Sequence, residues 1–231
     1  MALIAAVALI PTGHAGTDIA QNWAGYVAIG QQFTSVTATW TEPQLRGKGA
    51  TAQRVDIWVG LDGAVRGSST VEQTGIDAVC GQGGNSGPSC FAWHEMFPKP
   101  LVPITTAQVE GVGSEDMVIR AGDTVTATVT SLGNQRFQLT LVDDTQGKSF
   151  SIIETSKVAR CDSAEIIVEA QEHVWGFADF DPVRFTDCAV DGRPLAAFDC
   201  KTANIAINGG RRMTSTSALG ADDASFTVTR R

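Results

Sequence analysis

The chain has 231 residues, of which 43% are hydrophobic and only 18% are charged, and its formal net charge is −8. A chain of this size fits one large β-sandwich or barrel and can bury enough surface to form a core without a structural metal. The acidic balance, and the lack of a basic stripe interleaved with aromatic residues, argue against nucleic acid as a partner.

The first fifteen residues differ in character from the rest. Residues 2–10 are an apolar run, which residues 11–13 interrupt with Pro-Thr-Gly. This run resembles a signal peptide whose basic start is missing, and nine residues are too few to span a bilayer. We therefore expect a signal peptide remnant over residues 1–15, a single domain over residues 16–231, a secreted mature chain and no membrane partner.

Alternating strands dominate the rest of the chain. Valine, alanine and tryptophan alternate with threonine over residues 36–41, and similar alternation recurs over residues 125–129, 137–141 and 226–228. Glycine-asparagine pairs at 133–134 and 208–209 predict turns, the first within a hairpin. About a dozen short strands without an amphipathic helix predict an all-β fold, a jelly-roll β-sandwich of two antiparallel sheets.

Five cysteines fit an exported protein. Cys80 and Cys90 bracket a loop rich in glycine, and Cys188 and Cys200 bracket another, which leaves Cys161 over. Each bracketed loop is suited to closure by a disulfide, although the sequence does not determine connectivity. No CxxC occurs and the spacing does not fit zinc, so no metal and no cofactor are expected.

Residues 70–75, TVEQTG, have a strand pattern with a polar side chain in an unexpected place. Alternation puts Val71 and Gln73 on one face and Glu72 on the other. A buried amide costs free energy unless it is hydrogen-bonded. If Val71 faces a core, Gln73 must find a partner on that face.

Carboxyl groups stand among large apolar residues in three further stretches. In AEIIVEAQE, residues 164–172, Glu165 and Glu169 share a face with an isoleucine; the alternative interpretation is an edge strand with a solvated face. In WVGLDG, residues 58–63, Asp62 shares a face with Trp58, although core packing and a turn are the simpler interpretations.

In AWHEMFP, residues 92–98, Glu95 shares a face with Trp93 and Phe97. If one concave face of a sandwich gathered these carboxyl groups, Gln73 could bond a carboxylate or a substrate oxygen. Hydrolases of other classes are poorly supported. No GxSxG stretch supplies a serine nucleophile, HEMF is not HExxH, and the chain has three histidines, at positions 14, 94 and 173.

Six stretches occur in the order found in one known family. They are NWAGYV at 22–27, WVGLDG at 58–63, EQTGID at 72–77, AWHEMFP at 92–98, AEIIVEA at 164–170 and FADFDPVRFTDC at 177–188. With these stretches the chain resembles the glutamic peptidases, or eqolisins (peptidase family G1), from about Asn22 to Asn208. The resemblance implies a concanavalin A-like sandwich and an acid endopeptidase that acts on proteins or peptides.

The resemblance also implies a site. The catalytic dyad would be Gln73 and Glu169, the second glutamate of its stretch. The residues that would line the substrate-binding cleft are Trp23, Trp58, Asp62 and Glu95. This chain departs from the family pattern at Glu72, where an apolar residue is usual, and at His94 and Met96, where aromatic residues are common. The early cysteine that would partner Cys161 is missing, so we expect Cys161 to be a free thiol.

The dyad would work by acid–base chemistry. Glu169 would take a proton from water and later give it to the leaving nitrogen, while the amide of Gln73 would stabilise the oxyanion. Desolvation among tryptophans should raise the pKa of Glu169, which predicts activity on the acid side that fades toward neutrality. Two alternatives stay open: a lectin-like, carbohydrate-binding sandwich, and a glycoside hydrolase that uses Glu95 and Glu169. By analogy with other secreted hydrolases we expect a monomer.

Overall fold

The computed structural model describes residues 19–46, 52–80, 89–105, 109–111, 117–171, 176–207 and 211–231. The predicted signal peptide remnant, His173 and the predicted turn at Asn208 and Gly209 lie outside these ranges. Within them, no helix has the length and apolar character that crossing a membrane requires.

Short strands make up nearly all of the described structure. The single helix among the described residues is one 3₁₀ turn, Leu195–Ala197. The strands are β1 (Trp23–Ile29), β2 (Ser35–Thr41), β3 (Gln53–Leu61), β4 (Val71–Cys80), β5 (Ser89–Phe97), β6 (Val102–Pro103), β7 (Val109–Gly111), β8 (Val118–Ile119), β9 (Thr124–Ser131), β10 (Arg136–Asp143), β11 (Lys148–Thr155), β12 (Ser163–Glu169), β13 (Gly176–Phe177), β14 (Val183–Val190), β15 (Arg193–Pro194), β16 (Cys200–Ala203), β17 (Ala206–Ile207), β18 (Arg211–Arg212), β19 (Thr214–Thr216) and β20 (Phe226–Arg230).

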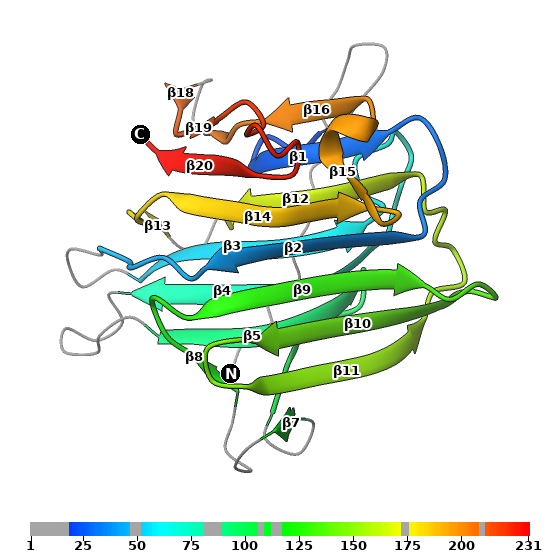
Figure 1. The fold of residues 1–231 in the computed structure, drawn as a ribbon, viewed down its shortest axis with the longest axis horizontal. Coiled ribbons are helices and arrows are strands. Elements are labelled where there is room, and N and C mark those ends of the chain that lie inside the picture. Colours follow the sequence, from blue (N-terminus) through cyan, green and yellow to red (C-terminus); the bar gives the residue numbers. More distant parts are fainter. Residues whose placement is uncertain are drawn as a thin grey trace.

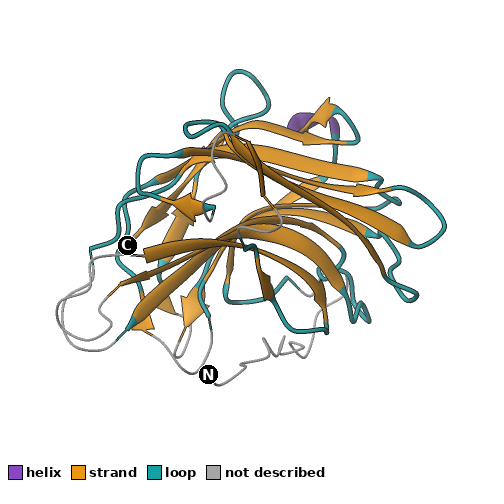
Figure 2. Ribbon diagram, turned by 90° about the horizontal axis from the view of Figure 1, so that it is seen from below, coloured by secondary structure: helices purple, strands orange, loops and turns teal. Residues whose placement is uncertain are grey.

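Two large sheets lie one over the other, as Figures 1 and 2 show. Sheet A has the strand order β16-β1-β12-β3-β4-β5-β6, and sheet B has the order β19-β20-β14-β2-β9-β10-β11-β7. Neighbours along both orders run antiparallel, whereas β13 joins β3 in parallel. The predicted all-β sandwich of two antiparallel sheets is confirmed.

Sheet B shows the alternation that the sequence predicts. In β2, Val36, Ala38 and Trp40 are buried against sheet A, and β9 and β10 repeat the pattern. The intervening threonines face outward and pair across strands, with 2.8 Å between the hydroxyl oxygens of Thr37 and Thr128. One face packed against the core and one face exposed to solvent are typical of an antiparallel sheet.

Sheet A differs because both of its faces are covered. Its inner face contributes to the core between the sheets, and its outer face carries a second apolar cluster. The members of this cluster are Trp23, Val27, Trp58, Ala64, Val71, Trp93, Ile167 and Ala203. Since β12 lies between β1 and β3, the edge-strand interpretation of the AEIIVEAQE stretch is wrong.

The predicted hairpin turn at Gly133 and Asn134 is confirmed. The two residues lie between β9 and β10, and both have positive φ angles, 74° and 50°. Glycine and asparagine tolerate this left-handed conformation better than other residues do.

The two expected disulfides are not formed. Cys90, Cys161, Cys188 and Cys200 are free thiols, which agrees with the expectation for Cys161 alone. Cys90 pairs in register with Ala78, so it is displaced by two residues from the position opposite Cys80. Diagonal side chains on neighbouring strands lie farther apart than the roughly 4 Å between β-carbons that a disulfide needs.

Candidate active site

Gln73 lies in the middle of β4, on the outer face of sheet A. Its side chain is buried, and Nε2 donates a hydrogen bond of 2.5 Å to Oε2 of Glu95. The two residues are register partners on β4 and β5. Among the described residues no donor reaches Oε1 of Gln73. The amide is thus held by one of its groups, and its carbonyl oxygen keeps its capacity to accept.

Two glycines make room for the tryptophan beside Gln73. A Cβ at Gly75 would lie 2.6 Å from Cβ of Trp58 and 2.1 Å from the carbonyl oxygen of Ile57. A Cβ at Gly60 would lie 3.0 Å from the Trp58 ring and 3.2 Å from Cβ of Gln73. Their lack of a side chain therefore lets the Trp58 indole lie flat on sheet A beside Gln73.

Glu169 is the last residue of β12, and nitrogen donors surround its carboxyl group. Oε1 accepts from Nδ2 of Asn22 at 2.7 Å, and Oε2 accepts from Nε1 of Trp58 at 2.8 Å. Trp23, the register partner of Glu169, packs edge-on against Trp58 with ring centroids 5.0 Å apart. Asn22 and these two tryptophans thus hold the carboxyl group in a defined orientation.

Gln73 and Glu169 flank β3 on the same face of sheet A. Gln73 pairs with Gly60 and Glu169 pairs with Asp56, so their partners are four residues apart along β3. Trp58 lies midway between these partners. The charge of Glu95, the partner of Gln73, acts on Glu169. The structure therefore brings Gln73, Glu95, Trp58, Trp23 and Glu169 to one region.

Both carboxyl groups of this region hold their protons more tightly than in water. Burial raises the pKa of Glu95 to about 7, and the hydrogen bond from Gln73 opposes the shift. Burial likewise raises the pKa of Glu169 to about 7. Hydrogen bonds from Trp58, Trp23 and Asn22 lower the pKa of Glu169, while the charge of Glu95 raises it. Both carboxyl groups are therefore largely protonated in acid.

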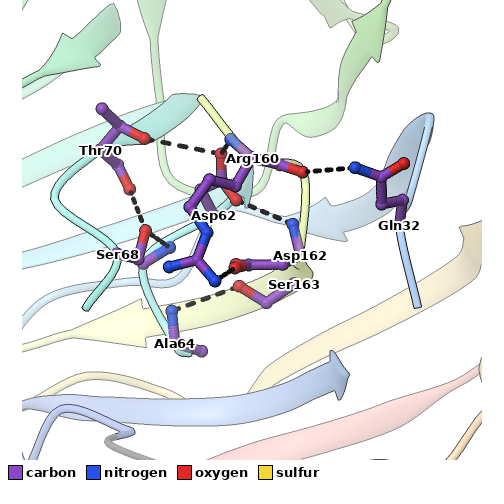
Figure 3. Close-up of polar contacts among 9 residues, drawn as sticks. Gln32, Asp62, Ala64, Ser68, Thr70, Arg160, Asp162 and Ser163 are labelled. Atoms are coloured by element: carbon purple, nitrogen blue, oxygen red, sulfur yellow. Dashed lines mark hydrogen bonds and ion pairs between the residues drawn. The ribbon is translucent and has the colours of Figure 1, made fainter. Parts of the chain in front are cut away.

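Asp62 belongs to a different set of contacts, which Figure 3 shows. It follows β3 with a positive φ of 70°, so the alternation that predicted a shared face with Trp58 ends before it. Its two oxygens accept from the backbone amides of Arg160 at 2.8 Å and Asp162 at 2.9 Å, and one also accepts from Thr70 at 3.5 Å. Its described hydrogen bonds join the segment before β4 to the segment before β12, and none reaches Gln73 or Glu169.

The departures from the family pattern lie on the opposite face. Glu72 is fully buried, with burial raising its pKa to about 8, so it points away from Gln73 as the strand pattern predicts. His94 stacks on Phe150 of sheet B, with ring centroids 5.3 Å apart. Burial lowers the pKa of His94. Neither residue is placed to touch a substrate on the outer face.

Several residues around Glu169 were not predicted from the sequence. They are Asn22, Arg54, Asp56, Asp77 and Gln171. Strand alternation places Arg54 and Asp56 on the same face of β3 as Trp58, so the sequence could have predicted that they lie on the site face. The position of Gln171 could not be predicted in this way, because β12 ends at Glu169 and alternation does not extend beyond it. Among the described residues no group of three or more histidine, cysteine or acidic side chains is arranged to hold a metal.

Comparison with known proteins decides the family. The sequence profile of the Peptidase A4 family matches residues 21–230. The chain belongs to the peptidase A4 family. It is 30% identical over 206 residues to scytalidopepsin B from Scytalidium lignicola, which covers 82% of this chain and 72% of that protein. It is 28% identical over 199 residues to aspergillopepsin-2 from Aspergillus niger, which covers 76% of this chain and 66% of that protein.

Solved structures of peptidase A4 relatives share the fold. A scytalido-glutamic peptidase with a transition state analog inhibitor superposes with a TM-score of 0.72 and 26% identity, covering 91% of this chain and 98% of that one. Aspergilloglutamic peptidase from Aspergillus niger gives a TM-score of 0.61 and 28% identity, and the match covers 78% of this chain and 99% of that one. A third match, also at 91% of this chain, is described as a member of the eqolisin family of peptidases. The resemblance to glutamic peptidases is confirmed.

Proposed function

We propose that this peptidase is a secreted, monomeric acid endopeptidase, formed by one domain over residues 16–231, whose catalytic dyad is Gln73 and Glu169. The observation that carries the proposal is the way their polar groups are held. Donors on Asn22 and Trp58 fix the carboxyl group of Glu169, and Glu95 fixes the amide of Gln73. Both groups stand on central strands of a sheet, which is the rigid support that a catalytic arrangement needs.

Hydrolysis begins with the activation of water. The carboxylate of Glu169 takes a proton from a water molecule as the water oxygen bonds to the scissile carbonyl carbon. The carbonyl π electrons move to oxygen and form an oxyanion. Oε1 of Gln73, an acceptor with no described donor, is suited to orient the water, and the second N–H of Nε2 is suited to stabilise the oxyanion.

The second half returns the proton. Protonated Glu169 gives its proton to the amide nitrogen, the carbon–nitrogen bond breaks, and the oxyanion collapses to a carboxylic acid. The protons balance, because the one taken from water leaves with the amine. Glu169 begins and ends each cycle as a carboxylate, so it needs an environment that favours the charged form in acid. Its three nitrogen donors favour the charged form, but burial outweighs them and raises the pKa of Glu169 to about 7, so the carboxylate is the minor form in acid.

Glu95 has a different role in this scheme. Burial raises the pKa of Glu95 to about 7 and it accepts a hydrogen bond from the amide of Gln73, so it is neutral in acid. It orients Gln73 and adds no second charge. Trp23 and Trp58 form a buried apolar layer beside Glu169, and Asp62 supports that layer by joining its flanking segments.

Loss of the dyad should abolish cleavage of a denatured protein such as casein. We expect Gln73→Ala and Glu169→Gln to lower kcat by about 100-fold or more at acid pH, the usual effect of removing an oxyanion donor. Two matched substitutions on sheet B, Gln138→Ala and Glu154→Gln, should leave kcat within about twofold. Circular dichroism would first establish that all four variants are folded. Dyad variants that cleave as fast as the controls would refute the assignment.

A further inference from the structure

Arg54 lies on the site face of β3, two residues before Asp56. Its side chain is only 15% exposed. Nε donates to Oδ1 of Asp77 at 2.6 Å, and Nη2 donates to Oδ2 of the same residue. The guanidinium also lies 5.8 Å from the ring centroid of Phe91. A bidentate arginine–carboxylate pair is both strong and geometrically defined, so Arg54 is fixed in this position.

Three carboxyl groups lie side by side next to this cation. Glu169 pairs in register with Asp56, and Asp56 pairs with Asp77. They form a row across β12, β3 and β4 on the outer face of sheet A. Directly opposed side chains on neighbouring strands have their β-carbons about 5 Å apart. Three such neighbours cannot all be ionised beside one arginine, so the row must hold a proton.

Asp56, in the middle of the row, is the group best placed to hold that proton. It is 3% exposed, and Oδ2 accepts a hydrogen bond of 2.7 Å from Nε2 of Gln171. Burial raises the pKa of Asp56 well above the usual value, and the charges of Asp77 and Glu169 raise it further. The charge of Arg54, whose Nε lies 3.8 Å from Oδ1 of Asp56, opposes this shift. Burial also raises the pKa of Asp77, while hydrogen bonds from Arg54 and Asp56 lower it. Asp56 is thus the acid that keeps its proton, and Asp77 is the acid that is ionised.

We propose that Arg54 and Asp56 are positioning residues for Glu169, an inference that rests on the peptidase mechanism proposed above. Arg54 fixes Asp77 as a carboxylate, Asp77 accepts the proton of Asp56, and Asp56 presents a neutral carboxyl group to Glu169. Because its neighbour is neutral, Glu169 loses its proton at a lower pH than it would beside a second carboxylate. Arg54 and Asp56 act through their neighbours and touch neither substrate nor water in this scheme.

The remaining groups that face Glu169 in the described ranges are few. Asn22 and Trp23 face it from the start of β1, and Trp58 faces it from β3. From β5, the charge of Glu95 acts on it. Of these four only Glu95 titrates. A change at Arg54 or Asp56 should therefore appear as a distinct movement of one limb of the pH profile.

Asp56→Asn is the first test, because asparagine imitates the neutral carboxyl group. We expect kcat/KM at the acid optimum to stay within about threefold of wild type. The neutral limb of the profile should move upward by roughly half a pH unit or more, since asparagine cannot become an anion beside Glu169. A loss of more than about 100-fold in folded protein would overturn the proposal, because it would mean that Asp56 works as a carboxylate.

Arg54→Gln is the second test, and it should move the acid limb of the pH profile of kcat/KM. Loss of the cation disfavours a carboxylate in the row, so the acid limb should rise by roughly half a pH unit or more. The matched controls are Arg46→Gln and Asp181→Asn, which remove the partners of an exposed ion pair outside the site. Neither control should move either limb. An Arg54→Gln profile that overlies those of the controls would also overturn the proposal.

A readout without catalysis separates this proposal from the function on which it rests. In protein labelled with ¹³C at glutamate carboxyl groups, the Glu169 resonance is the one that disappears in Glu169→Gln. Its titration midpoint should move upward in Arg54→Gln. A moved midpoint in a protein that cleaves no peptide would refute the peptidase mechanism and keep the positioning role. An unmoved midpoint in an active peptidase would refute the positioning role alone.

Discussion

At the scale of single residues, Trp58 connects the two halves of the proposed dyad. Its ring fills the space that Gly60 and Gly75 leave open beside Gln73, and its Nε1 donates to Glu169. The side chain is fully buried, so its packing and its hydrogen bond are both fixed. A core role was the simpler prediction for a tryptophan in a strand, and the structure assigns it that role together with a polar one.

Trp58→Phe should separate these two roles. Phenylalanine keeps most of the apolar contact and removes the N–H that favours ionised Glu169. A hydrogen bond to a charged group contributes about 1.5–3 kcal/mol, and one pKa unit corresponds to about 1.4 kcal/mol. The acid limb of kcat/KM should therefore rise by about one pH unit or more, as read from initial rates between pH 2 and 8. An unmoved limb with a reduced rate would show that the ring alone matters.

At the scale of elements, the sequence predicted the strands and buried residues of sheet B more completely than those of sheet A. The strands of sheet B have one wet face, so strict alternation along β2, β9 and β10 predicted both the strands and their buried residues. In β4 nearly every residue is buried, because the inner face meets sheet B and the outer face carries the tryptophan cluster. Alternation could place Gln73 and Glu72 on opposite faces but could not show which groups cover each face.

The close contact between β3 and β4 makes a further prediction. At Gly75 an added Cβ would lie 2.1 Å from a backbone oxygen of β3, which cannot move without disturbing the ladder. Gly75→Ala should therefore lower the unfolding free energy by about 3 kcal/mol or more, the upper end of the range for overpacked cores. Gly147→Ala is the comparison: its φ is 66° and nothing lies near its Cβ, so it should cost only about 1 kcal/mol. Urea unfolding would compare the two, and equal costs would contradict the packing argument.

At the scale of the whole molecule, buried acids outnumber the cations placed beside them in the described structure. Glu42 and Glu72 both have their pKa raised to about 8 by burial, and burial also raises the pKa of Glu165. A raised pKa means that the folded state binds more protons than the unfolded state between the two pKa values. The resulting stability is complete below about pH 4.5 and is lost as the pH rises toward 8.

Glu72→Gln should therefore flatten the fall in stability. In wild type we expect Tm to drop between pH 5 and pH 8, and in Glu72→Gln to drop less, because the amide carries no charge to bury. Differential scanning calorimetry at several pH values would measure this. Parallel Tm curves for the two proteins would show that Glu72 does not titrate in this range.

The titration of His94 should change the stability of the fold with pH in the opposite direction to that of Glu72. Its pKa is lowered by burial, so the unfolded state binds its proton more readily and stability is lost as the pH falls below about 6.5. His94→Phe keeps an aromatic ring against Phe150 and removes the titrating group. Its Tm should exceed that of wild type at pH 4 and should match it more closely at pH 7. A Tm deficit that is the same at both pH values would contradict this explanation.

The fold and the candidate dyad could be predicted from the sequence, but the groups that support the dyad could not. Six short stretches in order pointed to Gln73 and Glu169. Partners such as Asn22 and Gln171 come from chain segments 147 residues and 115 residues away from the groups that they bind. Only strand pairing brings them together. The expected disulfide between Cys80 and Cys90 was wrong for the same reason, because spacing along the chain does not determine the register of β4 and β5.

The central claim is that one carboxylate, Glu169, and one amide, Gln73, carry out peptide hydrolysis in acid. The most direct measurement is kcat/KM between pH 2 and 8 for wild type and Glu169→Gln on one peptide substrate. The mechanism predicts a bell-shaped profile for wild type that falls toward neutrality as Glu95 and Asp56 lose their protons. It also predicts a loss of about 100-fold or more across the range in Glu169→Gln. A rate that is flat from pH 3 to pH 8, or a folded Glu169→Gln variant as active as wild type, would contradict it.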